Sequence, residues 1–354
     1  METLHDGFGG CHAKEGAVSA EIGFSRMQRL VGGLCLASLA VVGLCAGPAE
    51  VRAQTPKLDV GISLTWWGHV PIMLAVEKGY FKEQGLDVTV QSIGSSADRI
   101  RAVTAGSVAW SNLGRLAVIS EMSRGNESFY YFANIDDSPG NEGCWARPGF
   151  ASFKDLKGRK VAANSSAEIT LSGLLQAEGM KITDVDFVNL PGGEMAAAIG
   201  KGDVDAACVW EPLFAAVKAA APGGALLGTD KDTENFKKFG TMESPDILII
   251  SRKLVDEQPA VATKLVTAIF KGVEYTNAQP EDTANTVAHY FRKSPEIVLA
   301  AMKTFHYFGK ENWKEHMRLH SGQMQYLAEW LHANGKIPTV PDTRKWEATG
   351  FVPE

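Results

Sequence analysis

The strongest constraint on the fold is an alternation of strands and helices that occurs in two successive sets along the chain. In the first set, short apolar or alternating runs predict strands at 58–62, 86–90, 108–112 and 128–133, with helices between them. Parallel neighbouring strands need a long crossover connection, which a helix usually supplies. The repeated strand–helix–strand units therefore predict an α/β fold in which mostly parallel sheets are flanked by helices.

A second set of strands is predicted at 160–163, 185–190, 206–210 and 246–250, and from residue 253 onward the pattern is helical only. Helix-only sequence after a sheet indicates that the chain has returned to cover the first lobe. We therefore expect two lobes joined by two hinge strands, a plan that suits closure around a ligand. The expected division is lobe 1 over 54–146 and 244–340, lobe 2 over 147–243, crossings near 144–148 and 243–247, and a tail over 341–354.

The first fifty-three residues differ from the rest and predict an export signal. Met27 is a plausible true start, Arg29 supplies a positive charge, and an apolar stretch covers 30–46. Small residues then favour cleavage after Ala53, which predicts a periplasmic protein. A membrane anchor is the alternative, because the run reaches about the minimum length for spanning, but no stop-transfer pattern follows. Cys45 suggests a lipoprotein, although the residue before it is leucine where a small one is wanted.

Cleavage at this point would leave two cysteines, Cys144 and Cys208. They can pair in an oxidising compartment. Both lie in apolar, strand-like runs, however, so two buried free thiols is the preferred interpretation. Neither has a second cysteine or a histidine at metal-ligand spacing, and the sequence therefore supports no zinc site.

Four segments in order resemble the nitrate/sulfonate/taurine class of solute-binding proteins. Each segment alone is weak evidence, but together they span most of the chain after the signal. The resemblance implies a two-lobed periplasmic binding protein fold of the type II-like plan. It also implies a small-molecule ligand, the permease of an ABC transporter as partner, and a monomer. The segments are 75–88 (AVEKGYFKEQGLDV), 102–113 (AVTAGSVAWSNL), 153–162 (FKDLKGRKVA) and 202–212 (GDVDAACVWEP).

Within that class the taurine-binding proteins are the most similar, on the evidence of residues 111–114, 188–190 and 209–212. Two residues depart from the pattern of the taurine-binding proteins and leave the identity of the bound solute open. Arg115 stands where those proteins tend to have a small residue, and Glu211 is acidic where a small residue can occur. The fold is therefore implied by the resemblance, whereas the identity of the solute is not.

In open α/β sheets, ligands lie beyond the carboxyl ends of the strands and against the starts of helices. Two Ser-rich loops, at 94–97 and 164–167, precede predicted helices and can hold an anionic group. Serine and asparagine are also common helix caps for structural reasons alone. Trp66 and Trp67 follow the first strand, where one can stack on a ring or a cation and the other can pack the lobe. His69 can donate to an anion or cap the next helix.

Acidic residues near strand ends and crossings favour an amine, an amidine or a zwitterion over nitrate. Most charged residues are solvated, but Glu211 follows a buried strand and Asp246 lies beside a predicted hinge. Asp136 belongs to the same acidic group. Arg115 can clamp a carboxylate or a sulfonate, or can be solvated at a helix start. The candidate ligand contacts are Trp66, Trp67, His69, Ser95, Ser96, Asn112, Arg115, Asp137, Glu142, Asn164, Ser165, Ser166, Trp210, Glu211 and Asp246.

The net charge of -6 argues against a nucleic-acid partner. No catalytic serine elbow, phosphate loop or dinucleotide motif occurs, so we predict no enzyme, no cofactor and no metal. The leading hypothesis is capture of taurine or a similar amino-sulfonate for an ABC importer. The alternatives are a binder of a heteroaromatic or cationic nitrogen compound, such as a pyrimidine precursor, and a ligand-sensing subunit. An enzyme resembling the pyrimidine-precursor synthases of the same fold is opposed by the export signal.

Overall fold

A computed structural model describes residues 56–164 and 167–354. The predicted export signal, the start at Met27 and Cys45 lie outside these residues, as do Ser165 and Ser166. Within the described ranges, no helix combines the length and the apolar character needed to cross a bilayer.

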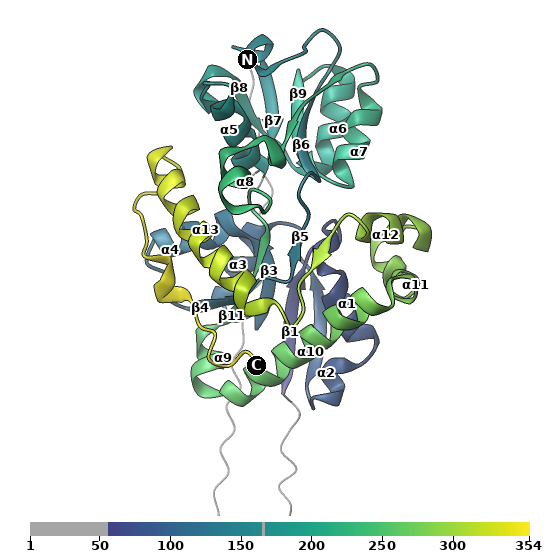
Figure 1. The fold of residues 1–354 in the computed structure, drawn as a ribbon, viewed down its shortest axis with the longest axis vertical. Helices are drawn as coiled ribbons and strands as arrows, with labels where there is room; N and C mark the ends of the chain where they lie inside the picture. Colours follow the sequence, from purple (N-terminus) through teal and green to yellow (C-terminus); the bar gives the residue numbers. More distant parts are fainter. Residues whose placement is uncertain (1–55, 165–166) are drawn as a thin grey trace, which may run out of the picture. The chain divides into compact units, whose positions relative to one another are not determined.

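Two five-stranded sheets organise the chain, and they lie one above the other in Figure 1. In the first sheet, β11 is antiparallel to both of its neighbours, while the other strands run in one common direction. The strand order is β2 (Asp87–Ser92), β1 (Lys57–Ile62), β3 (Trp110–Gly114), β11 (Asp246–Ser251) and β4 (Phe129–Ala133).

The second sheet repeats this plan, with β6 as its reversed strand. Its order is β10 (Ala225–Thr229), β6 (Glu142–Ala146), β9 (Ala206–Trp210), β7 (Lys160–Ala163) and β8 (Asp186–Asn189). A short pair, β5 (Asp136–Asp137) and β12 (His306–Tyr307), forms a third sheet. The predicted α/β class with mostly parallel, helix-flanked sheets is confirmed.

Helices flank both sheets. The first sheet carries α1 (Val70–Glu77), α2 (Tyr80–Glu83), α3 (Ser96–Thr104) and α4 (Arg115–Ser123), and the chain returns to it with α9 (Arg252–Glu257), α10 (Pro259–Ala278), α11 (Pro280–Phe291), α12 (Pro295–Met302) and α13 (Trp313–Ala333). The second sheet carries α5 (Ala167–Ala177), α6 (Gly192–Lys201), α7 (Leu213–Ala220) and α8 (Glu234–Phe239). Helix α10 packs directly on α1, since a Cβ at Gly272 would lie 2.4 Å from the carbonyl oxygen of Pro71.

The core follows from the alternation of side chains along the strands. In β7, Val161 and Ala163 face the α5 side and pack with Leu171, whereas Ala162 faces the opposite side and packs with Met195. The second sheet is therefore covered on both faces. The first sheet and the C-terminal helices share one larger apolar cluster.

Two boundaries differ from the sequence-based expectation. Strand β6 pairs with β9 and β10, so the first crossing precedes residue 142 instead of falling near 144–148. The segment expected to be a tail is packed, because Trp346 and Phe351 are buried and the Trp346 Nε1 donates to the Asn126 carbonyl at 2.6 Å. Aromatic residues near the C-terminus were the overlooked signal, since each buries a large apolar area.

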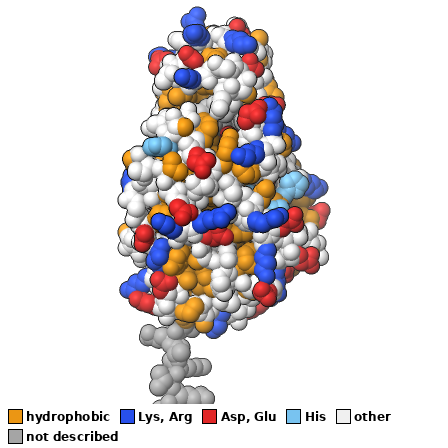
Figure 2. Space-filling model, turned by 60° about the vertical axis from the view of Figure 1, so that its left-hand side comes forward, with side chains coloured by type: hydrophobic (Ala, Val, Ile, Leu, Met, Phe, Trp, Pro, Cys, Tyr) orange, Lys and Arg blue, Asp and Glu red, His pale blue; other side chains and the backbone are white. Residues whose placement is uncertain are grey.

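On the face displayed in Figure 2, positive and negative side chains are interspersed, and no single basic field covers it. Such a mixed surface gives no long-range attraction for a polyanion. This distribution agrees with the acidic net charge of the whole sequence.

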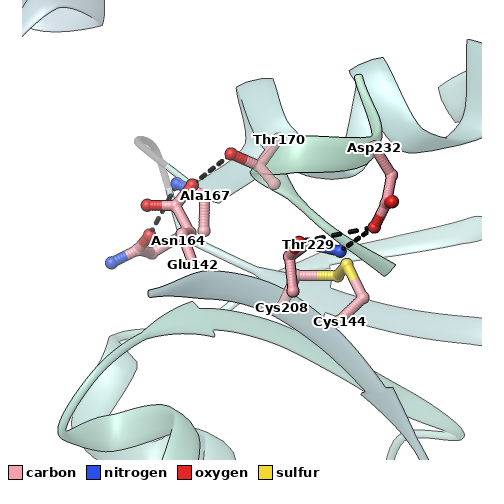
Figure 3. The surroundings of a disulfide bond; sticks show 8 residues. All are labelled: Glu142, Cys144, Asn164, Ala167, Thr170, Cys208, Thr229 and Asp232. Atoms are coloured by element: carbon pink, nitrogen blue, oxygen red, sulfur yellow. Dashed lines mark hydrogen bonds between the residues drawn. A yellow bond between two sulfur atoms is a disulfide. The ribbon is translucent and has the colours of Figure 1, made fainter. Parts of the chain in front are cut away.

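Cys144 and Cys208 form a disulfide, which corrects our preference for two free thiols (Figure 3). Cys144 lies on β6 and Cys208 on β9, and the antiparallel register places them directly opposite each other. Their Cα atoms are 4.0 Å apart. The apolar character of the two runs correctly indicated buried strands, but it carried no information on which strands would become neighbours.

Candidate functional site

A cavity of about 480 Å³ lies where strand ends of the two sheets meet. Strands β1, β2, β7, β8 and β9 reach it with their carboxyl ends, as expected for a ligand site in this class of fold. The reversed strands β6 and β11 reach it with their first residues. The lining residues are Ser63, Thr65, Trp66, Gly94, Ser95, Ser96, Arg99, Glu142, Asn164, Asn189, Leu190, Pro191, Gly192, Gly193, Trp210, Leu213, Met242, Ser244 and Asp246.

The corner between β2 and α3 presents a capped helix start to the cavity. Ser95 is the N-cap, and its hydroxyl accepts a hydrogen bond from the Asp98 backbone N–H at 3.1 Å. The Ser96 hydroxyl accepts from the Gly114 N–H at 3.1 Å and from the Arg99 Nη2 at 3.0 Å. These serines therefore fix the helix start while also lining the cavity, so the structural and ligand-binding interpretations are compatible.

Arg99 supplies the positive charge of the cavity lining, and sequence reasoning missed it. Its Nη1 donates to the carbonyl oxygens of Ile93 at 2.8 Å and Gly94 at 3.1 Å, and its Nη2 lies 4.0 Å from the Asp246 carboxylate. Its Nε is buried and has no hydrogen-bond partner among the described residues. Burial lowers the pKa of the guanidinium, while Asp246 opposes that shift. The sequence did contain an indication of this position, because Arg99 lies three residues after the candidate contact Ser96 on the same short helix.

A buried polar network supports the floor of the cavity. Trp66 Nε1 donates to the Asp136 carboxylate at 2.9 Å, and Asn112 Nδ2 donates to its other oxygen at 2.8 Å. His69 Nε2 lies 3.2 Å from the Asp246 carboxylate. Burial and the nearby Asp246 raise the pKa of Asp136 well above its usual range. His69 and Asn112 therefore lie behind the lining, where they orient Trp66 and Asp246.

The second sheet contributes a carboxyl group and an aromatic wall. Glu142, the first residue of β6, is 3% exposed and accepts a hydrogen bond from the Thr170 hydroxyl of α5 (Figure 3). Burial raises the pKa of Glu142 to about 7. Trp210, at the end of β9, meets Trp66 edge to face with ring centroids 6.5 Å apart. Asn164 lies beside Glu142 and accepts from the Ala167 N–H at 3.2 Å.

Arg115 does not reach the cavity, which corrects its assignment as a candidate contact. Its side chain is fully buried, and the guanidinium bonds to Gln323 and His320 of α13. Burial lowers the pKa of Arg115 to about 9, so it remains charged at neutral pH. Helix α13 covers the start of α4, and this long-range packing is invisible in the local sequence.

Three further candidates also lie away from the cavity. Trp67 is 1% exposed and packs against Phe291, its ring centroid 4.1 Å away, so it is the lobe-packing member of the tryptophan pair. Asp137 accepts from the Met242 N–H at 3.1 Å and thereby ties the two crossings together. Glu211 accepts from the Ala215 N–H and binds Lys218, each at 3.0 Å, so it stabilises the start of α7.

The structure thus brings together seven of the predicted contacts: Trp66, Ser95, Ser96, Glu142, Asn164, Trp210 and Asp246. Sequence reasoning missed Ser63, Thr65, Arg99, Asn189 and Ser244. Asn189 ends β8 before a Gly-rich turn, so the strand-end argument applied to Asn164 would have found it. Within the described ranges, no group of three or more His, Cys, Asp or Glu side chains is arranged to hold a metal ion.

Residues 66–283, more than half of the chain, match the family described as NMT1/THI5-like. The chain belongs to the NMT1/THI5-like family. A binding protein of Brucella abortus is 26% identical over 247 residues, covering 69% of this chain and 75% of its own. The taurine-binding periplasmic protein of Escherichia coli K12 is 25% identical over 242 residues, covering 67% and 72%. A 4-amino-5-hydroxymethyl-2-methylpyrimidine phosphate synthase of Saccharomyces cerevisiae is 27% identical over 226 residues, covering 60% and 64%.

Among solved structures, the aliphatic sulphonate-binding protein of Escherichia coli superposes on this NMT1/THI5-like chain with a TM-score of 0.68. It is 18% identical, and the alignment covers 84% of this chain and 94% of that protein. This likeness shows the periplasmic binding protein fold. The predicted resemblance to solute-binding proteins of the sulfonate and taurine class is confirmed at the level of family and fold.

Proposed function

We propose that this protein is the solute-binding component of an ABC importer and captures a small amino-sulfonate, with taurine as the leading candidate. The observation that carries the proposal is the composition of the cavity. Arg99 is joined there by five hydroxyl and two amide side chains contributed from both sheets: Ser63, Thr65, Ser95, Ser96, Ser244, Asn164 and Asn189. A set so rich in hydrogen-bond donors suits an ionised group with several acceptor oxygens.

The anionic end of the solute is held by Arg99 and by helix starts. Helices α3 and α6 both begin at the cavity, at Ser96 and Gly192. The first turn of a helix carries unpaired N–H groups and a partial positive charge, which together favour an anion. Ser244 adds a buried hydroxyl that has no hydrogen-bond partner among the described residues.

The charges of the lining favour a zwitterion over a simple anion. Arg99 is positive, whereas Glu142 and Asp246 are acidic, and all three are buried. A nitrate ion would add a negative charge to a site that already holds two carboxyl groups. An amino-sulfonate brings its own ammonium group, which compensates buried acidic charge at a site where solvent screening is weak.

The aromatic walls support the second candidate, a heteroaromatic or cationic nitrogen compound. Trp66 and Trp210 come from different sheets and face the same cavity. Their ring faces offer contact to a planar ring or to a cation. A pyrimidine precursor would use these walls and the two carboxyl groups, but it would make less use of Arg99 and the helix starts.

Capture is proposed to shift an equilibrium between open and closed lobes, after which the closed form docks on a membrane permease. A ligand that contacts both lobes has a higher affinity for the closed state and therefore populates it. The same proposal includes export through the predicted signal, a periplasmic location and action as a monomer. Co-purification with a permease supports it, whereas co-purification with a membrane kinase supports a sensor subunit.

The lining favours binding over catalysis. Within the described ranges, the cavity residues include no cysteine and no histidine, and the two described cysteines form the disulfide. A synthase like the yeast relative would need reactive side chains at its site. We therefore propose that no bond is made or broken in this cavity.

A thermal-shift screen tests the proposal with taurine, alkanesulfonates, nitrate, pyrimidines and guanidinium compounds. A ligand at ~100 times its dissociation constant stabilises the folded state by about 2.7 kcal/mol. We expect taurine and short amino-sulfonates to raise the melting temperature most. A shift produced only by nitrate, or by none of the panel, would contradict the proposal, and a shift produced only by pyrimidines would favour the second candidate.

A further inference from the structure

Glu142 is a buried acidic residue of the cavity lining with no cation beside it. It begins β6 directly after the first crossing between the sheets, and its side chain reaches both the cavity and α5. The Thr170 hydroxyl donates to its carboxylate, as Figure 3 shows. No ion pair to Glu142 occurs among the described residues. A buried carboxylate with one neutral donor is poorly compensated for the loss of water.

The charged groups that face Glu142 make its ionisation harder. Glu243 and Asp246 approach from the second crossing and the start of β11, and Asp230 approaches from the turn after β10. All of them are acidic. Arg99 lines the same cavity, but its guanidinium lies 4.0 Å from Asp246 and bonds to backbone carbonyls. Thr170 on α5 contributes no charge. An ionised Glu142 therefore has acidic groups around it and no cation of its own.

These surroundings favour the protonated form of Glu142 more than water would. Burial, with smaller contributions from Glu243 and Asp246, raises the pKa of Glu142 to about 7. At neutral pH the ligand-free cavity therefore contains a mixture of protonated and ionised Glu142. The neighbours of Asp246 are of another kind, since His69 and Arg99 both lie beside its carboxylate.

We propose that Glu142 selects a solute carrying a positively charged nitrogen and that capture of such a solute expels a proton from the cavity. The inference rests on the proposed function and specifies how that site discriminates. The ammonium group of the solute keeps its own protons. The carboxylic acid of Glu142 loses its proton to the solvent, and the resulting carboxylate pairs with the ammonium group.

This coupling makes affinity depend on pH in a defined direction. Only protein molecules with an ionised Glu142 can pair with the ammonium group of the solute. For a carboxyl group with a pKa of about 7, the ionised fraction rises about tenfold between pH 6 and pH 8. The affinity for taurine should therefore rise by up to about tenfold over this range. Both charged groups of taurine remain ionised there, so the change belongs to the protein.

The test is isothermal titration calorimetry of the wild-type protein with taurine and with ethanesulfonate, which lacks the amine. Titrations at pH 6, 7 and 8 in two buffers of different ionisation enthalpy count the protons released. We expect about half a proton released per taurine at pH 7, and none released with ethanesulfonate. Infrared difference spectra on addition of taurine to the wild-type protein should show loss of a protonated carboxyl band.

The variant Glu142→Gln tests whether the released proton comes from Glu142. Glutamine has nearly the same shape as glutamate and keeps an oxygen that accepts from the Thr170 hydroxyl, but it has no proton to release. This variant should bind taurine about tenfold more weakly at pH 8, with no proton release and a flat pH profile. Glu211→Gln is the matched control, since Glu211 lies outside the cavity lining and pairs with Lys218, and it should behave as the wild type.

The outcomes separate the two proposals. Binding of taurine with constant affinity and no proton release would overturn the role of Glu142 and leave the proposed function intact. Equal proton release from Glu142→Gln would also overturn it. If neither taurine nor ethanesulfonate binds at any of the three pH values, the proposed function itself fails and the role of Glu142 fails with it. Should Glu142→Gln not fold, taurine binding to the wild-type protein without any loss of a protonated carboxyl band would overturn the role of Glu142.

Discussion

Two arginines of the first lobe are both buried near helix starts, yet they lie in different settings. Arg99, on α3, lines the cavity, and its guanidinium bonds to the backbone carbonyls of Ile93 and Gly94. Arg115, at the start of α4, is enclosed by α13, where Gln323 and His320 bind its guanidinium. Both pKa values are lowered by burial. The chemical group is the same, but only one of the two is positioned to contact a solute.

The difference is produced by the element that packs on each helix start. The start of α3 faces the second sheet across the cavity, so a ligand can complete the surroundings of Arg99. The start of α4 faces α13, so Gln323 and His320 bind and enclose the Arg115 guanidinium, although its Nε also has no partner among the described residues. Burial of an arginine is therefore not by itself a sign of function.

The largest expected effect is on stability, from Arg115→Ala. The substitution leaves Gln323 and the buried His320 without their partner and opens a cavity under α13. We expect the free energy of unfolding to fall by about 3–5 kcal/mol. Urea denaturation measures this loss. In the folded variant, taurine affinity should stay within about threefold of wild type; a loss of binding without a loss of stability would reverse the roles assigned to the two arginines.

Arg99→Gln should instead act on binding. Removal of the guanidinium takes away the positive charge of the lining, and taurine affinity should fall by about 100-fold, or about 2.7 kcal/mol. Calorimetric titration measures the change. Arg101→Gln on the same helix is the control, because Arg101 is exposed and pairs with Asp98 on the surface. Equal effects of the two substitutions would remove Arg99 from the site.

His320→Gln should have the smallest effect and only in acid. Burial, and next the charge of Arg115, keep the pKa of His320 well below its usual 6.5. Between 6.5 and that lower value the unfolded chain binds more protons than the folded one, so stability falls as the pH falls. The wild type should therefore lose up to about 2 kcal/mol more than the variant between pH 7.5 and pH 5. His289→Gln, at an exposed position, is the control in the same denaturation series.

Periodicity predicted two helix-flanked sheets, because apolar spacing reflects which strands and helices are buried, but it predicted no strand at β10 of the second sheet. Strand-end logic also placed seven candidates around one cavity, among them Trp66, Glu142 and Asp246. It failed for Arg115, and it did not tell which of Trp66 and Trp67 packs the lobe, because the neighbours His320 and Phe291 come from helices about two hundred residues later. No local pattern reports such packing.

Two other errors have the same origin. Glu211 looked available because it follows a buried strand, but Lys218 and the start of α7 satisfy its carboxylate. The disulfide between Cys144 and Cys208 depends on the register of β6 against β9, which becomes defined only when the sheet forms. Arg99 was missed for the opposite reason. A charged residue in an amphipathic helix is usually solvated, whereas Arg99 is buried against the loop before α3 and lies beside Asp246 of β11.

A crystal structure of the protein with the sulfonate that raises its melting temperature most tests the proposed binding mode directly. We expect sulfonate oxygens within hydrogen-bond distance of Arg99 and of the serine hydroxyls at the start of α3, with any ammonium group beside Glu142. A ligand bound outside this cavity would contradict the proposed binding mode. So would a ligand whose sulfonate lies beside Glu142 and whose ammonium group lies beside Arg99.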